Sequence, residues 1–360
     1  MVKQLKWRFL GVFVPSVLIS VLGIGGDVIL LRNRVDEEHL KWHRIRLISI
    51  IITYTLAVLV NPGRPPKNFE PDESIARLCT FCKKCNSKRP PRSHHCRICN
   101  QCVLRMDHHC PWTNNCVGHR NLLHFVRFLT CATWGLCVYF VELCGISSEL
   151  WSSRHQPMLD STISKFELTT LIIFTPTTLL LAFSIFILWV RSIWDLCLNI
   201  TLIETWEKER AESQYRQGRL SKTEIDFPFD LGSPLDNLQA ALGPCWFWCI
   251  PFSTPDGDGI HFLVDEDSRD SVWPPPDPDQ VKMAVFSPYR PSDSSSVPTR
   301  RRKPHPPPSS STSSRSGSDS NYSDEDEIRP LSHWNKDKWE SQDGEKLEDF
   351  GVDLDAELDS

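Results

Sequence analysis

The stretch from Cys82 to Cys116 carries the residues of this chain that are best suited to chemistry. Its 35 residues contain seven cysteines and four histidines, the densest such cluster in the sequence. Two four-coordinate zinc sites need eight cysteine or histidine ligands, so this stretch holds a surplus of candidates. The function of the chain therefore depends on which of these residues bind metal and which are left over.

Several of the cysteines have the spacing of metal ligands. Two pairs are separated by two residues, which lets both sulfurs of a turn face one ion: Cys82 with Cys85, and Cys96 with Cys99. Cys102, Cys116 and the two His-His doublets can supply the remaining ligands. Interleaved histidines favour zinc over an iron–sulfur cluster. A ligand set that starts at Cys79 also fits the spacing.

The second doublet lies in the segment Asp107-His108-His109-Cys110, where an acid, two imidazoles and a thiol follow one another. If one histidine binds metal, its neighbour can contact Cys110 while Asp107 fixes the tautomer of that imidazole. This is the arrangement of acid, base and nucleophile for covalent catalysis by a thiolate. The alternative is that all four residues serve a structural zinc site.

Four apolar segments must position this cluster, because each can cross a hydrocarbon layer of about 30 Å as a helix. They are Phe9–Leu31, Leu47–Val60, Leu122–Ile146 and Leu168–Val190. The second is the shortest, and a buried helix of a soluble domain is its alternative reading; tilt and local thinning of the bilayer allow a short span. The sequence thus predicts an α-helical membrane protein with four spans.

Two charged residues fall inside the third predicted span. Arg127 lies about one turn into it, where its guanidinium is expected to reach the lipid head groups. Glu142 lies near the opposite end, and we expect it at the membrane–water interface rather than in an intramembrane functional site.

Four spans place both termini and residues 61–121 on the same side of the membrane. That side carries most of the Lys and Arg residues near the spans, which predicts that it is cytoplasmic. Cysteines in that reducing compartment are expected to be metal ligands or nucleophiles and not disulfides. The net charge of −5 combines a basic middle with an acidic tail and gives no support to nucleic-acid binding.

The chain divides into five predicted regions. Residues 1–60 form the first two spans with a short lumenal loop, and residues 61–121 form a cytoplasmic linker and the cysteine-rich zinc domain. The third and fourth spans occupy 122–196, and a cytoplasmic cap follows at 197–270. Residues 271–360 are low in complexity and rich in Ser, Pro and acidic residues, so we expect a mostly disordered acidic tail.

The membrane context favours catalysis over a purely structural role. Cys110 lies twelve residues before Leu122, where the third span begins. A reactive thiol at that place meets groups that carry long acyl chains at the lipid–water boundary. Thioester exchange suits a thiolate, and coenzyme A is a good leaving group.

Three groups of residues also match one known family. They are Cys82-x2-Cys85 with Arg89-Pro90-x-Arg92, then His94-His95-Cys96-x2-Cys99-x2-Cys102, then Asp107-His108-His109-Cys110-Pro111-Trp112-x2-Asn115-Cys116-Val117-Gly118 followed by Asn121. Together they resemble the DHHC cysteine-rich domain of membrane protein S-acyltransferases (palmitoyltransferases). That family is similar in having four spans with this domain between the second and the third.

The resemblance implies a role for each residue. Two structural zinc ions would be held by two ligand sets, Cys82, Cys85, His95 and Cys102 in one and Cys96, Cys99, His109 and Cys116 in the other. Cys110 would take an acyl group from the co-substrate acyl-CoA, such as palmitoyl-CoA, and pass it to a substrate cysteine. His108 would act as the base, Asp107 would orient it, and Arg89 and Arg92 would contact the CoA phosphates.

Some features depart from the family pattern, and others point to one branch of it. The usual Asp-Pro-Gly after the second span is Asn61-Pro62-Gly63 here, and Thr-Thr-x-Glu after the fourth is Thr201-Leu202-Ile203-Glu204. The segments Leu5–Trp7, Asn61–Pro65 and Leu347–Ser360 resemble the fungal endoplasmic-reticulum branch that acylates chitin synthase. That branch implies an endoplasmic-reticulum membrane location and chitin synthase among the membrane protein substrates.

The competing functions are a non-catalytic membrane-anchored zinc adaptor and a membrane ubiquitin ligase.

Overall fold

A computed structural model describes residues 2–32, 34–153, 163–221, 225–255, 257–265, 268 and 272–275, although side chains are described only from Leu10 onward. All of these residues belong to one compact unit, Met1–Pro276 with Glu340–Ser360; the second unit is Asp277–Trp339. The predicted disordered tail lies outside the described residues, apart from residues 272–275.

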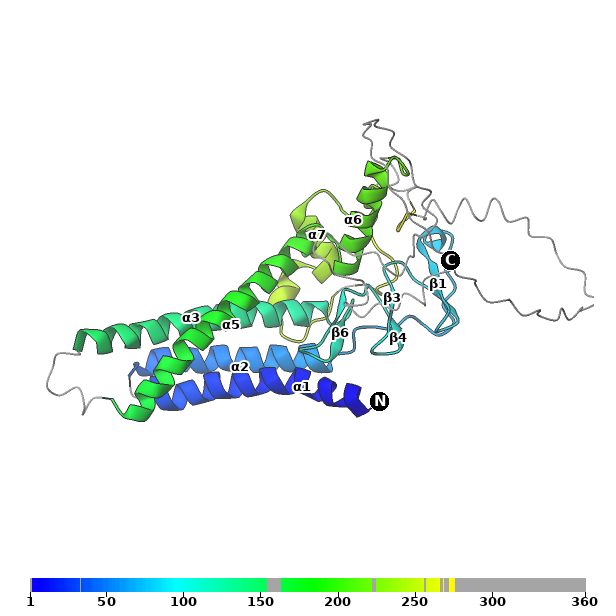
Figure 1. The fold of residues 1–360 in the computed structure, drawn as a ribbon. Coiled ribbons are helices and arrows are strands. Elements are labelled where there is room, and N and C mark those ends of the chain that lie inside the picture. Colours follow the sequence, from blue (N-terminus) through cyan, green and yellow to red (C-terminus); the bar gives the residue numbers. More distant parts are fainter. Residues whose placement is uncertain are drawn as a thin grey trace, which may run out of the picture. The chain divides into compact units, whose positions relative to one another are not determined.

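Four long helices form the membrane part of the fold (Figure 1). The first runs through α1 (Val2–Leu18) and continues in π-helical turns, η1 (Ile19–Gly25) and η2 (Asp27–Leu31). The others are α2 (Glu37–Leu59), α3 (Leu122–Ser153) and α5 (Lys165–Cys197). Each is long and apolar enough to cross a membrane, which confirms the four predicted spans.

The second helix begins ten residues earlier than its apolar run. Asp36 caps it by accepting a hydrogen bond from the backbone N–H of His39 at 2.8 Å, and Glu37 and Glu38 occupy the first turn. Its apolar face stays exposed, with Ile48 at 54%. Such a face fits lipid better than the interior of a soluble domain.

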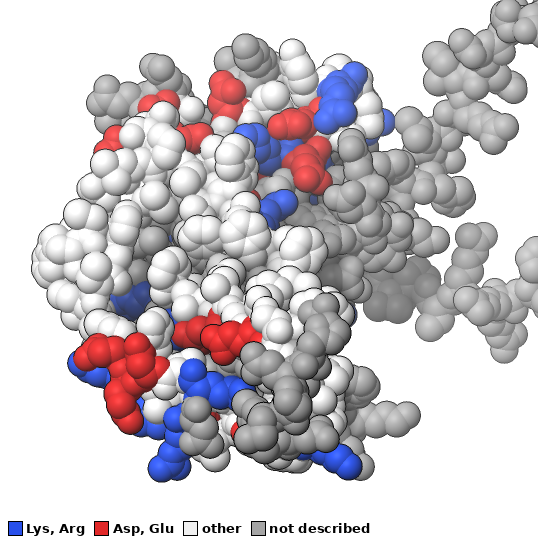
Figure 2. Space-filling view, turned by 90° about the vertical axis from the view of Figure 1, so that its left-hand side faces the viewer, with Lys and Arg blue, Asp and Glu red and all other residues white. Residues whose placement is uncertain are grey.

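Figure 2 views the molecule from the end of the helices away from the cysteine-rich domain. Uncharged side chains cover most of the middle of this face, and charged side chains gather toward its upper and lower parts. The side chain of Glu142 is 12% exposed and therefore packs inside the helical bundle. Arg46 and His43 of α2 both pair with it, and a partner on the facing helix lowers the cost of burying a charge.

The Arg127 side chain is buried against a later segment of the chain. Its guanidinium donates to the backbone carbonyls of Phe247, Trp248 and Pro251. These carbonyls belong to the short 3₁₀ turn η5 (Cys245–Cys249) and the residues after it. A turn of this kind leaves carbonyls without helical partners, and Arg127 satisfies them.

The cysteine-rich module follows the short turn η3 (Ala76–Leu78) and consists of three antiparallel hairpins. Their strands are β1 (Thr80–Cys82) with β2 (Ser87–Arg89), β3 (His94–Cys96) with β4 (Gln101–Val103), and β5 (His108–Cys110) with β6 (Asn115–Val117). Each strand boundary of one hairpin recurs fourteen residues later in the next hairpin. The left-handed turn residues do so too: Asn86, Asn100 and Asn114 have φ of 50°, 51° and 47°. The module is therefore a structural repeat.

Hydrogen bonds fasten the third hairpin to the second span. The Asn115 side chain donates to the carbonyl of Val60, just past the end of α2, at 2.9 Å. The Tyr54 hydroxyl, on the same helix, donates to the carbonyl of Trp112 at 2.9 Å. The residues around Cys110 are thus held at the end of the helical bundle.

The predicted cap packs on the outer side of the module. Helix α6 (Leu202–Arg216) begins with a capping box between Thr201 and Glu204, and α7 (Pro234–Leu242) follows. Arg92 of the module forms a buried ion pair with Glu204, and both side chains are 1% exposed. An aromatic cluster that includes Phe229 and Trp273 closes the cap, which therefore extends past residue 270.

Replacing Glu204 by Ala should strongly destabilise the protein. The change leaves the Arg92 charge buried without its partner, which costs about 3–5 kcal/mol. Glu212→Ala is the matched control, because Glu212 pairs with Arg216 on the exposed face of the same helix and is worth about 0.3–0.5 kcal/mol. Thermal unfolding of the detergent-solubilised protein checks this, and equal losses for the two variants would contradict it.

Candidate active site and metal sites

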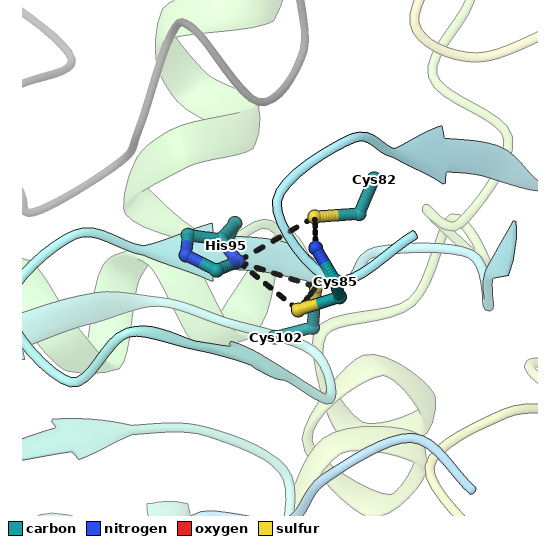
Figure 3. Close-up of side chains that lie close together, drawn as sticks. All are labelled: Cys82, Cys85, His95 and Cys102. Atoms are coloured by element: carbon teal, nitrogen blue, oxygen red, sulfur yellow. Dashed lines mark hydrogen bonds between the residues drawn. The ribbon is translucent and has the colours of Figure 1, made fainter. Parts of the chain in front are cut away.

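The first cluster brings together Cys82, Cys85, His95 and Cys102 (Figure 3). The Nδ1 atom of His95 lies 3.4 Å from the sulfur of Cys82, 3.3 Å from that of Cys85 and 3.8 Å from that of Cys102. The sulfurs of Cys85 and Cys102 are 3.6 Å apart. All four donor atoms therefore surround one point.

The second cluster repeats this geometry fourteen residues later, with Cys96, Cys99, His109 and Cys116. The Nδ1 atom of His109 lies 3.7 Å from the sulfur of Cys96 and 3.5 Å from those of Cys99 and Cys116. Cys79, the alternative first ligand, stands outside both clusters in the described part of the chain. Burial is the main cause that raises the pKa of its thiol, to about 11.

Both clusters fit zinc. With Zn–S bonds of about 2.3 Å and Zn–N bonds of about 2.0 Å, the donors of a tetrahedron lie roughly 3.5–3.8 Å apart, as they do here. Burial and the neighbouring thiols raise the pKa of Cys102, and hydrogen bonds from Cys96 and Cys99 raise that of Cys116. A divalent cation among these sulfurs would remove the repulsion between thiolates. The ion would be structural, since all four positions are taken by protein.

The hairpin repeat explains how each cluster is assembled. The turn of one hairpin gives two cysteines, and the paired strands of the next hairpin give a histidine and a cysteine, as in the cross-strand pair His95 and Cys102. Successive strand residues point to opposite faces, so His95 binds in the first cluster and Cys96 in the second. Each metal site therefore joins two consecutive hairpins.

The third hairpin is the last of the series. Cys110 stands fourteen residues after Cys96, at the position of the first turn cysteine. The chain then enters α3 at Leu122 in place of a fourth hairpin that would complete a third cluster. Cys110 is consequently a turn cysteine that the repeat leaves without a metal site.

Asp107, His108 and Cys110 converge at this position. The carboxylate of Asp107 accepts a hydrogen bond from Nδ1 of His108 at 2.9 Å, and its other oxygen accepts one from the backbone N–H of Leu202 at 2.7 Å. Leu202 is the first residue of α6, where the positive end of the helix favours a carboxylate. The His108 ring also packs edge-on against Phe125 of α3.

These contacts set the charges of the three residues. Burial opposes ionisation of all three, but the hydrogen bonds and charges among them are stronger. Asp107 raises the pKa of His108 to about 10, and its own pKa is lowered. The neighbouring imidazolium lowers the pKa of Cys110. The site therefore favours an imidazolium at His108 and shifts Cys110 toward its thiolate form.

Cys110 and His108 open into a cavity of about 630 Å³ inside the helical bundle. Residues of all four spans line it, and from Leu122 to Tyr139 it follows α3 for seventeen residues, or about 25 Å. Its walls are mostly apolar side chains. A long hydrocarbon chain attached at Cys110 could extend into it.

The two arginines expected to contact CoA are both buried. The side chain of Arg92 is 1% exposed, and its guanidinium donates to Glu204 and to Asn199. These protein groups occupy the guanidinium of Arg92, and a CoA contact by Arg92 stays a prediction. Arg89 is 4% exposed, and its Nε donates to the Thr80 hydroxyl at 3.0 Å. A CoA contact by Arg89 stays a prediction.

The sequence interpretation missed Thr113 and Asn115, which hold the active-site turn. Thr113 is buried beside Cys110, and Asn115 ties the hairpin to α2. A signal was present in the fourteen-residue repeat, where Thr113 aligns with Cys85 and Cys99 and each of the three is followed by asparagine.

The sequence profile of the DHHC palmitoyltransferase family matches residues 78–209. The palmitoyltransferase PFA4 of Yarrowia lipolytica is 32% identical over 354 residues, covering 96% of this chain and 97% of that protein. Palmitoyltransferase PFA4 of Saccharomyces cerevisiae is 33% identical, covering 98% of this chain and 99% of that protein. Palmitoyltransferase pfa4 of Aspergillus fumigatus is 34% identical, covering 95% of this chain and 92% of that protein.

This chain belongs to the DHHC palmitoyltransferase family. The family resemblance seen in the sequence is thereby confirmed, and with it an enzyme of the protein S-acyltransferase class in a membrane. Its Asp107-His108-His109-Cys110 segment is the Asp-His-His-Cys sequence after which DHHC proteins are named.

Metal content should separate the ligands from the nucleophile. Cys96→Ala removes one donor of the second cluster and should lower the zinc content from two ions per chain toward one, with a lower yield of folded protein. Cys110→Ser should keep both ions, since Cys110 lies outside both clusters. Elemental analysis of the purified proteins measures this. Loss of zinc from Cys110→Ser would contradict the assignment.

Proposed function

We propose that this palmitoyltransferase transfers a long-chain acyl group from acyl-CoA to cysteines of membrane proteins through a thioester on Cys110. The observation that carries the proposal is the convergence of Asp107, His108 and Cys110 on the wall of the cavity among the four spans. Cys110 is 4% exposed and would be reached through that cavity.

The first step loads the enzyme. The Cys110 thiolate attacks the carbonyl carbon of the acyl-CoA thioester, a C–S bond forms to Cys110, and the bond to CoA breaks. His108 holds the proton taken from the thiol and can return it to the CoA thiolate. Asp107 keeps the imidazole oriented by its hydrogen bond to Nδ1. The acyl chain would lie in the cavity among the spans.

The second step transfers the acyl group to protein. A substrate cysteine attacks the Cys110 thioester, with His108 accepting its proton, and the Cys110 thiolate leaves. The substrate thiol must come to the end of the spans that carries the module, which restricts substrates to cysteines close to the membrane surface. The two zinc ions would hold the hairpins and take no part in bond making.

The proposal also includes the orientation of the protein in the membrane, the organelle and the substrates. An excess of Lys and Arg beside the module supports a cytoplasmic position for it and for both termini. The motifs Leu5–Trp7, Asn61–Pro65 and the C-terminal segment support an endoplasmic-reticulum membrane and chitin synthase among the substrates.

A zinc adaptor without catalysis remains the competing function, and the cavity argues against it. An adaptor gains nothing from a cavity that follows α3 for about 25 Å and has a buried thiol in its wall. It also has no use for a histidine that is oriented by Asp107 toward that thiol.

Labelling with palmitoyl-CoA tests the acyl-enzyme. The purified protein should take up a hydroxylamine-sensitive label, and Cys110→Ser should take up none, because the serine hydroxyl is a far weaker nucleophile. Cys79→Ser is the control, since that half-buried thiol lies just before the first hairpin and outside both clusters. Equal labelling of Cys110→Ser and the unchanged protein would refute the proposal.

Filling the cavity should shorten the acyl chains that the enzyme accepts. Leu136→Trp adds bulk to the cavity wall on α3 and should reduce labelling by palmitoyl-CoA several-fold while sparing octanoyl-CoA. Val141→Trp is the control on the exposed face of the same helix, where Val141 is 67% exposed. The ratio of initial labelling rates for the two acyl-CoAs is the measurement. A uniform loss for both chains would contradict a cavity-bound acyl group.

A further inference from the structure

The end of the cavity that lies away from Cys110 carries polar side chains. The last turn of α2 is tied to the third hairpin, so the cavity-lining residues near the beginning of α2, His43 and Arg46, lie at the opposite end. Tyr139, the last lining residue on α3, meets them there, since its ring centroid is 5.3 Å from that of His43. We call His43, Arg46 and Tyr139 the polar end of the cavity.

Two of these side chains belong to a network between α2 and α3. Glu142, three residues after Tyr139, pairs with Nη2 of Arg46, and its other oxygen lies 3.5 Å from Nδ1 of His43. The side chains of His43 and Glu142 are 6% and 12% exposed, so protein surrounds them. Such pairing lowers the cost of placing a charge among membrane helices. Holding the two spans together therefore explains the carboxylate and the groups that touch it.

The network does not explain the hydroxyl of Tyr139. This residue is 4% exposed, and its buried hydroxyl has no hydrogen-bond partner among the described residues. The same holds for Nε of Arg46. A buried polar atom without a partner destabilises a protein, and phenylalanine would fill the same space as tyrosine. The hydroxyl and the Nε–H are therefore available to a polar group that enters this end of the cavity.

We propose that Tyr139 and Arg46 form a subsite for a hydroxyl group at the polar end, so that the enzyme accepts long acyl chains with a terminal hydroxyl. The inference rests on the proposed acyl-enzyme function and specifies its substrate class. The terminal oxygen would accept a hydrogen bond from Nε of Arg46 and share one with the Tyr139 hydroxyl. The thioester exchange at Cys110 is unchanged. Water offers the same hydroxyl chemistry, and the experiment below separates the two.

The position of the subsite makes its effect depend on chain length. Between Cys110 and the polar end, the α3 wall is apolar, with Leu129, Ala132 and Leu136. A terminal hydroxyl that stops there loses its water without gaining a partner, which disfavours it. A hydroxyl that reaches Tyr139 gains a hydrogen bond, worth about tenfold in rate. Short hydroxylated chains should therefore load more slowly than their unmodified counterparts, and longer ones faster.

Loading rates of paired acyl-CoAs test this dependence. The full-length protein in detergent micelles is given lauroyl-, palmitoyl- or stearoyl-CoA, or the ω-hydroxy counterpart of each. The initial rate of hydroxylamine-sensitive labelling then gives a ratio of hydroxylated to unmodified chain at each length. The ratio should lie below one for lauroyl-CoA and rise above one for a longer chain. A ratio below one at all three lengths refutes the proposal, and it is the result expected if water holds the subsite permanently.

Removal of the hydroxyl tests the role of Tyr139. Tyr139→Phe should lower the ratio for the favoured longer chain about tenfold and leave the lauroyl ratio unchanged. Thr133→Val is the matched control, because Thr133 carries another buried hydroxyl on α3 without a partner among the described residues and does not line the cavity. Its ratios should equal those of the unchanged protein. An unaltered ratio in Tyr139→Phe, or equal losses in both variants, would refute the subsite.

Displacement of the hydroxyl is a second test. A Cβ atom at Gly26 of the first span would overlap the Tyr139 hydroxyl, so Gly26→Ala must move that side chain. Gly25→Ala is the matched control, since its Cβ would come no closer than 4.0 Å to its nearest neighbour, a ring carbon of Phe174. Gly26→Ala should lose the preference for the long hydroxylated chain, and Gly25→Ala should keep it. The reverse result, or retention in both, contradicts the proposal.

Two further measurements separate the causes of failure. Zinc content and the thermal unfolding midpoint show whether each variant is folded, and a change in the ratio counts only for folded protein. If the unchanged protein takes up no label from palmitoyl-CoA, the proposed acyl-enzyme function fails. If it takes up that label but never prefers a hydroxylated chain, the function stands and the hydroxyl subsite is refuted.

Discussion

Shared metal ligation is the constraint on which the module depends. Strands of three residues do not hold together by backbone pairing alone, so the hairpins need another source of stability. Each metal site takes two ligands from one turn and two from the next hairpin, and in this way every hairpin is fixed by its neighbour. The last hairpin has metal ligands only in its strands, at His109 and Cys116. Its turn, which carries Cys110, is therefore held in place by the strand ligands and has no metal ligand of its own.

The position of the nucleophile relative to the helices comes from a separate set of contacts. Asn115 and Tyr54 tie the third hairpin to α2, while Arg92, in the segment between the first and second hairpins, pairs with Glu204 in the first turn of α6. The first N–H of α6 in turn binds Asp107. Asp107 is thus oriented by a helix that lies far away in sequence. The same network of contacts therefore stabilises the cap and aligns His108.

The sequence predicts the features of the fold that depend on residues close together in the chain, and not those that depend on distant partners. The four spans follow from local apolar length, and α2 exceeds its apolar run only because Asp36 caps a polar first turn. The spacing of the cysteines indicated zinc but left open whether Cys79 is a ligand. The fourteen-residue repeat would have excluded Cys79 from both ligand sets. The contacts of Arg92, Arg127 and Glu142 were not predicted. Their partners are about a hundred residues away in the chain, so local pattern contains no sign of them.

The repeat also gives a physical reason for the difference between Cys110 and the other turn cysteines. In the first two turns the backbone N–H of the second cysteine donates to the sulfur of the first, which supports negative charge on that sulfur. In the first two turns the metal and the following hairpin would occupy that sulfur and suppress its reactivity. In the third turn the chain continues into α3, and the same sulfur faces His108 and the cavity. The proposed reactivity of Cys110 therefore follows from its place in the last hairpin of the series, beside a membrane helix.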